Sequence, residues 1–105
     1  MGEYIQVSTT TGSKEDALKI ARKIIQERLA ACVQVEGPIE SIYRWEEKIQ
    51  EDEEWLVTVK TRRDKYESLE QTIKEIHPYD VPEIIGMPLT EGLRKYFEWM
   101  DEELA

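Results

Sequence analysis

The chain has 105 residues, the size of one domain, and we interpret residues 1–105 as a single domain. Its formal net charge is −9 at pH 7, with Lys and Arg interleaved among acids, which excludes the basic surface that nucleic-acid binders need. The single cysteine excludes a disulfide framework, and no segment resembles a signal peptide or a membrane span. We therefore expect a cytoplasmic protein without nucleic-acid or membrane partners.

The composition also points to the source. Asparagine is absent, Glu and Lys are abundant, and several pairs place Glu four residues before Lys, a spacing that supports helices. These features are typical of proteins from thermophiles, so we expect a thermophilic source.

The first elements are a strand and a helix. Residues 3–9 alternate apolar and polar side chains, as in a half-buried strand. Ser13 and Asp16 form a pattern similar to a capping box, and apolar residues then recur at helical spacing. The pattern predicts a helix over residues 14–29.

Residues 30–61 form the most strand-like part of the chain. Gly37-Pro38 predicts a break or bulge, after which Tyr43 and Trp45 share one face and Ile42 and Arg44 point to the other. The acidic run at 50–54 has low strand propensity and predicts the hairpin tip. From Trp55 a second strand returns, so the segment predicts a long two-stranded arm.

The last third predicts a helix, a short strand and a further helix. Asp64 is placed to cap a helix that ends before Pro78, because the residue preceding proline avoids helical geometry. Prolines at both ends of residues 81–88 confine that strand to an edge. A final helix is predicted from Thr90.

The order strand–helix–strand, strand–helix–strand and terminal helix predicts an α+β fold. Two such units interleave into a ferredoxin-like split β-α-β sandwich with an antiparallel sheet in the order 4-1-3-2. The long β-hairpin arm and the C-terminal helix are additions to it. We expect the helices to leave one sheet face free for assembly.

Five segments, taken in order, carry a resemblance to a known family. They are ERLAACVQV, SIYRWEEKI, VKT, HPYDVPEII and YFEW. Together they closely resemble the CutA family of divalent-cation-tolerance proteins, from about residue 4 to residue 100. The resemblance implies a ferredoxin-like protomer in a tight homotrimer, a role in tolerance of divalent metals, notably copper, and no established catalytic activity.

The arm itself supports self-association. An unpaired two-stranded arm is an aggregation hazard, and Tyr43, Trp45 and Trp55 give it apolar surface that needs a cover. A closed three-fold ring would cover both the edges and the aromatic side chains. We expect these three residues at the trimer interface.

His77 is the only histidine and has two interpretations. It could ligate Cu(II) or another divalent cation, helped by Asp80 and Glu83. Alternatively it caps the second helix as a cation at the negative end of the dipole, the interpretation we favour. In copper-binding members of the family a cysteine and a second histidine are implicated, and here Ser8 and Ile76 replace them. Any copper binding should therefore be weak, and no cofactor is certain.

The remaining candidates are weaker. Cys32 suits core packing, and the acidic run lacks the spacing of a calcium loop. Lys60, Arg62 and Arg63, with the turn at 9–12, suggest an alternative function. It is a PII-like trimeric signalling module that binds a small anionic effector at inter-subunit clefts. No catalytic motif is present, so we expect no enzyme.

Overall fold

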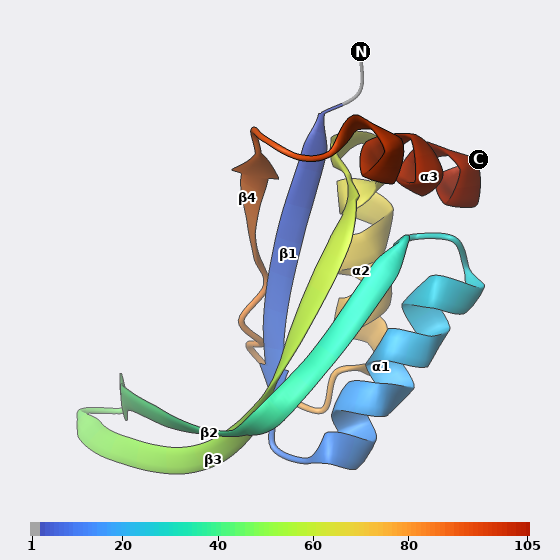
Figure 1. Ribbon diagram of the computed structural model, residues 1–105. Helices are drawn as coiled ribbons and strands as arrows, with labels where there is room; N and C mark the ends of the chain where they lie inside the picture. Colours follow the sequence, from blue (N-terminus) through green and yellow to red (C-terminus); the bar gives the residue numbers. More distant parts are fainter. Residues whose placement is uncertain (1–2) are drawn as a thin grey trace.

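The computed structural model describes residues 3–105 as an α+β fold around one four-stranded antiparallel sheet (Figure 1). The sheet order is β2-β3-β1-β4, as predicted. The elements are β1 (Tyr4–Thr11), α1 (Lys14–Gln26), β2 (Cys32–Trp45), β3 (Lys48–Arg62), a 3-10 turn (Arg63–Lys65), α2 (Tyr66–Ile76), β4 (Ile85–Leu89) and α3 (Arg94–Leu104). None of the helices in the described part of the chain is long and apolar enough to cross a membrane.

Helices α1 and α2 lie side by side on one face of the sheet (Figure 1). Their apolar stripes meet the inward side chains of β1 and β3, and the fully buried members include Val7, Ile24, Val59, Leu69 and Ile73. Burial of each such side chain contributes about 1.5–3 kcal/mol, so this layer is the main source of stability.

Helix α1 begins as predicted but ends earlier. The Ser13 hydroxyl accepts a hydrogen bond from the Asp16 amide at 3.1 Å, which satisfies one of the unpaired donors at the helix start. At the other end Arg28 adopts φ 57°, and the Leu29 amide donates to the Ile24 carbonyl at 2.9 Å. This is a Schellman motif, which ends the helix at Gln26 rather than at residue 29.

Helix α2 also starts later than predicted. The Asp64 carboxylate pairs with the Arg62 guanidinium at 3.0 Å and makes no capping contact, so the turn at 63–65 is 3-10 and α2 begins at Tyr66. The end is as expected: His77 has extended backbone, φ −74° and ψ 134°, because Pro78 follows it.

The hairpin of β2 and β3 extends beyond the helices and forms an arm, defined here as residues 39–54 (Figure 1). A register shift between Glu36 and Ile39 marks the predicted bulge, where the Trp55 side chain lies over Gly37. The tip is Glu46-Glu47, with φ values of 50° and 67°. The prediction of a tip at 50–54 is wrong, because those acids pair with Ile39–Tyr43 inside β3.

Helix α3 begins at Arg94, not Thr90, and packs against the opposite side of the sheet from α1 and α2. The Phe97 ring stacks on Tyr4 with centroids 4.2 Å apart, and Asp101 accepts hydrogen bonds from Tyr4 at 2.8 Å and Arg62 at 3.2 Å. Tyr4 and Arg62 are register partners that point away from the core. The expectation that the helices leave one face free is therefore wrong for α3.

Candidate functional site

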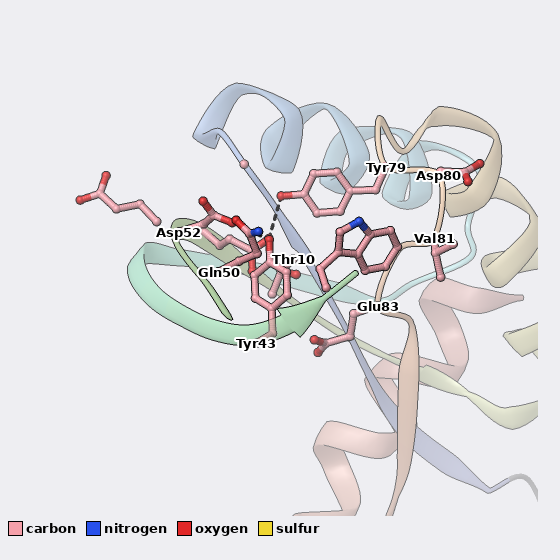
Figure 2. A pocket seen from close by; sticks show the side chains of 12 residues that line it. Thr10, Tyr43, Gln50, Asp52, Tyr79, Asp80, Val81 and Glu83 are labelled. Carbon is pink, nitrogen blue, oxygen red and sulfur yellow. Dashed lines mark hydrogen bonds between the residues drawn. The ribbon is translucent and has the colours of Figure 1, made fainter. Parts of the chain in front are cut away.

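A cavity of about 770 Å³ lies where the arm meets the loop that follows α2 (Figure 2). The arm supplies Tyr43, Trp45, Gln50, Asp52, Glu53 and Glu54, the loop supplies Tyr79, Asp80, Val81 and Glu83, and the end of β1 supplies Thr10 and Gly12. Aromatic rings and carboxylates thus face one space from two segments that are distant in the sequence. Its size is typical of sites for small organic molecules.

The deepest carboxylate in this cavity is that of Glu54. It is 7% exposed, and the Tyr79 hydroxyl donates to its Oε2 at 2.7 Å. Burial, together with this hydrogen bond to the carboxylate, raises the pKa of the Tyr79 phenol well above its usual range. Tyr79 therefore remains a neutral donor and holds Glu54 in place.

Tyr43 repeats this arrangement on the arm. Its hydroxyl donates to Asp52 Oδ2, and that bond to a carboxylate raises the pKa of the Tyr43 phenol. Tyr43 and Trp45 are 42% and 50% exposed, so both rings remain accessible. The strand pairing fixes their direction, because Tyr43 lies opposite Gln50 and Trp45 opposite Lys48 on the same face of the arm.

His77 lies beside the cavity and is buried, with 8% exposure. Its Nδ1 accepts from the Tyr79 amide at 3.1 Å, so Nε2 carries the ring proton and donates to the Thr10 carbonyl at 2.8 Å. The cationic cap predicted for the helix end is therefore wrong: an accepting Nδ1 has no proton. Instead the neutral ring ties the loop after α2 to β1.

The other positions considered for a metal do not gather around His77. Ser8 points to the sheet face opposite α2, because its neighbours Val7 and Thr9 are the buried ones, and Ile76 packs against the core. Within residues 3–105 no group of three or more His, Cys, Asp or Glu side chains is close enough to hold a metal ion. A metal at His77 would have to displace one of the two hydrogen bonds.

The three predicted interface residues lie in different environments. Trp55 is partly buried against its own core, whereas Tyr43 and Trp45 remain exposed. The most exposed apolar side chains of the arm are instead Ile42 and Ile49, which are 66% and 65% exposed on the other face. Sequence reasoning noted the face of Ile42 but not its exposure; the alternation Ile42–Arg44 and Ile49–Glu51 was the available signal.

The basic cluster is dispersed. Lys60 donates to Gln34 at 2.6 Å, Arg62 pairs with Asp64 and Asp101, and Arg63 pairs with Glu3. Arg62 lies opposite Tyr4, at the far end of β1 from the turn that follows Thr11. Within one protomer these bases and the turn therefore lie apart and do not form one site. Cys32 is partly exposed on β2 rather than in the core.

Comparison with known proteins gives a consistent result. A model of the CutA1 divalent ion tolerance protein family matches residues 5–103. The divalent-cation tolerance protein CutA of Thermus thermophilus is 44% identical over 96 residues, covering 91% of this chain and 93% of that one. The chloroplastic CutA protein of Arabidopsis thaliana is 46% identical over 96 residues, and this alignment covers 91% of this chain but only 53% of the relative. The chain thus spans about half the length of that relative.

Solved structures agree in fold. The crystal structure of the Thermus thermophilus protein superposes with a TM-score of 0.92 at 42% identity, covering 100% of both chains. CutA1 from Oryza sativa gives 0.95 at 42% identity, covering 98% of this chain and 94% of that one. The chain belongs to the CutA1 family of divalent ion tolerance proteins.

Proposed function

We propose that this divalent-cation tolerance protein works as a homotrimer that its arm holds together and that responds to metal ions. The observation that carries the proposal is the exposure of Ile42 and Ile49, 66% and 65%, on an arm that projects from the body. The protomer measures 45 × 25 × 22 Å, so its long axis is about twice the other two. Two large aliphatic side chains in water at such a projection need a cover.

The strand edges support the same assembly. β2 and β4 are the outer strands of the sheet, and each has one unpaired row of backbone groups. Ile85 and Met87 on β4 are 57% and 53% exposed, so the edge is also apolar. Association of arms with neighbouring edges in a closed ring satisfies both features without fibre growth.

The test is light scattering of the native chain and of an arm variant, Ile42→Lys with Ile49→Glu. Lys at 42 lies opposite Glu51 and Glu at 49 lies opposite Arg44, so the free arm tolerates both, whereas a joint between subunits would bury unpaired charge. We expect a trimer for the native chain and monomer for the variant. The control is Ile25→Lys, at a residue 42% exposed on α1, which should remain trimeric. A folded native monomer would contradict the proposal.

Copper binding through His77 is the second part of the proposal, and it should be weak. Both ring nitrogens already make hydrogen bonds, to Thr10 and Tyr79, and one must be broken before the imidazole can ligate Cu(II). Asp80 and Glu83 in the following loop are the carboxylates within reach in sequence. Binding should decrease in acid, because the ligand must be neutral.

Calorimetric titration with Cu(II) tests this part. The native chain should bind more weakly than proteins with several nitrogen or sulfur ligands, and His77→Ala should abolish the signal. Scattering data on the same samples separate loss of the ligand from loss of the assembly. Undiminished binding in an intact His77→Ala assembly would remove His77 from the site.

The cytoplasmic location also stays a prediction, since relatives are named chloroplastic and periplasmic.

A further inference from the structure

The loop that follows α2 carries a series of contacts from the body to the arm. His77 anchors the series in the body, because its Nε2 donates to the Thr10 carbonyl and its backbone amide donates to the Ile73 carbonyl, both at 2.8 Å. Its Nδ1 accepts from the Tyr79 amide at 3.1 Å, and the centroids of the two rings lie 4.8 Å apart. The backbone of Tyr79 is therefore held against the end of α2.

The Tyr79 hydroxyl completes the series on the arm. It donates to Oε2 of Glu54 at 2.7 Å, and Figure 2 shows the Tyr79 ring reaching from the loop toward the arm. Within residues 3–105 this is the one side-chain hydrogen bond that joins the arm to the rest of the molecule, since the Tyr43 hydroxyl bonds Asp52 inside the arm. Glu54 is 7% exposed, so water competes little for its carboxylate and the bond is strong.

Glu54 occupies the position at which the arm leaves the body. It lies opposite Ile39, and the two form the first pair beyond the register shift that follows Glu36. The next residue, Trp55, already pairs with Thr11 at the end of β1. A bulge bends and twists a strand, and a two-stranded hairpin without a covered face is marginal alone, so the bulge by itself fixes the direction of the arm only weakly. A hydrogen bond at this first pair restrains that direction.

The turn after β1 leaves room for this contact. A Cβ at Gly12 would lie 3.3 Å from the Tyr79 hydroxyl oxygen, so a residue larger than glycine would press on the donor. The Thr11 hydroxyl donates to the Ser13 carbonyl at 2.7 Å, which holds the turn in place. The Tyr79 hydroxyl therefore lies between this turn and Glu54, in position to donate to the carboxylate.

We propose that residues 77–79 form a strap that fixes the direction of the arm and so prepares the arm to associate with other copies of the chain. When the bond from Tyr79 to Glu54 is broken, the arm pivots at the bulge, and a smaller fraction of protomers is ready to associate. Tyr79 is a positioning residue, since it acts through Glu54. No metal takes part in the strap, and its effect on association rests on the arm-held trimer proposed above.

The first test measures the direction of the arm where no neighbouring subunit holds it. It compares backbone ¹⁵N–¹H residual dipolar couplings of the arm variant, Ile42→Lys with Ile49→Glu, with and without Tyr79→Phe. With the strap intact, a single alignment tensor should fit the amides of the arm and of the body. Tyr79→Phe keeps the ring but removes the donor, so the arm couplings should shrink relative to those of the body, because pivoting averages them. Unchanged arm couplings would overturn the proposal.

The matched control is Tyr43→Phe in the same arm variant. It removes a bond of the same kind, from a tyrosine hydroxyl to a carboxylate, but this bond lies wholly within the arm. The arm couplings should therefore keep their size relative to those of the body. A decrease as large as that caused by Tyr79→Phe would mean that the arm loses its internal order, rather than its link to the body, and would also overturn the proposal.

The second test measures association of the otherwise native chain by sedimentation equilibrium. Tyr79→Phe should weaken assembly about tenfold, since a hydrogen bond to a charged group contributes on the order of that factor. In a Glu54→Leu background the same change should add little, because the strap is already broken. Additive losses, or weaker assembly with unchanged arm couplings, would overturn the strap. A monomeric native chain would contradict the trimer, whereas the dipolar couplings would still decide on the strap, so the two failures are distinguishable.

Discussion

The hairpin of β2 and β3 passes through two environments. In the body, Val57 and Val59 are fully buried under α1 and α2, whereas on the arm Ile42 and Ile49 are 66% and 65% exposed. The two regions use the same strand pairing and the same kind of aliphatic side chain. The difference arises at the bulge, beyond which the strands extend past the helices (Figure 1).

This contrast separates fold from assembly. The body buries its own apolar layer and has the core of a domain. The arm is a two-stranded hairpin without a covered face, a structure that is marginal alone in water. Mutations in the body should therefore change the free energy of unfolding of the protomer. Mutations on the arm should instead change the association of protomers.

The largest effect is expected in the body. Ile24→Ala removes a fully buried side chain from the layer between α1 and the sheet, and should cost about 2–5 kcal/mol of unfolding free energy. Ile49→Ala is the matched change on the arm, and it should mainly weaken assembly. Urea unfolding at fixed protomer concentration, with light scattering, measures both. Equal losses of stability would abolish the contrast.

The next effect is expected at the boundary of the two regions. A Cβ added at Gly37 would lie 2.6 Å from Trp55 Cδ1, so Gly37→Ala must displace the indole, at about 1–3 kcal/mol. Gly86→Ala is the control, because the nearest atom to its Cβ would be Val7 Cγ2 at 3.5 Å, an ordinary contact. Thermal unfolding should show a clear loss of stability for Gly37→Ala and little loss for Gly86→Ala. A neutral Gly37→Ala would mean that the bulge does not fix the arm.

A smaller effect of opposite sign is expected at the arm tip. Glu46 and Glu47 both have positive φ, which Asn and Gly adopt at lower cost in a two-residue turn. Glu46→Asn with Glu47→Gly should stabilise the chain by roughly 1–2 kcal/mol. Gln at both positions removes the same charges but keeps the unfavourable backbone, so it serves as control. If the Gln variant gains as much in melting temperature, then charge repulsion, and not the positive-φ backbone, limits the stability of the arm tip.

The smallest effect concerns the contact of α3 with the body. The hydrogen bond from Tyr4, and then the Arg62 guanidinium, lower the pKa of Asp101 below its usual value. Since the folded pKa is the lower one, this stabilisation is present above about pH 4 and is lost as pH falls through the folded value. Asp101 is 43% exposed, so Asp101→Asn should cost only a few tenths of a kcal/mol at pH 7.

The measurement is urea unfolding of both proteins from pH 7 to pH 2.5. The difference between native and Asp101→Asn stability should shrink toward the acid end, because the native carboxylate becomes neutral there. A difference that is constant with pH would show that shape, rather than charge, holds α3 at this contact.

Much of the fold was readable in the sequence, because local signals set it. Ser13 capped α1, Pro78 ended α2, the alternating and helical periods gave the element order, and that order implied the sheet. The chemistry of these signals lies within a few residues of chain, so no tertiary contact was needed to recognise them.

Tertiary structure decided what had no local signal. Arg28 and Glu46-Glu47 take left-handed backbone without Gly or Asn, so the end of α1 and the arm tip were misplaced. Phe97 packs on Tyr4 and places α3 on the opposite side of the sheet. The cavity, too, required the fold, since Tyr79 reaches Glu54 across 25 positions of sequence. Such contacts depend on how the packed layers bring distant segments together, which residue patterns along the chain do not encode.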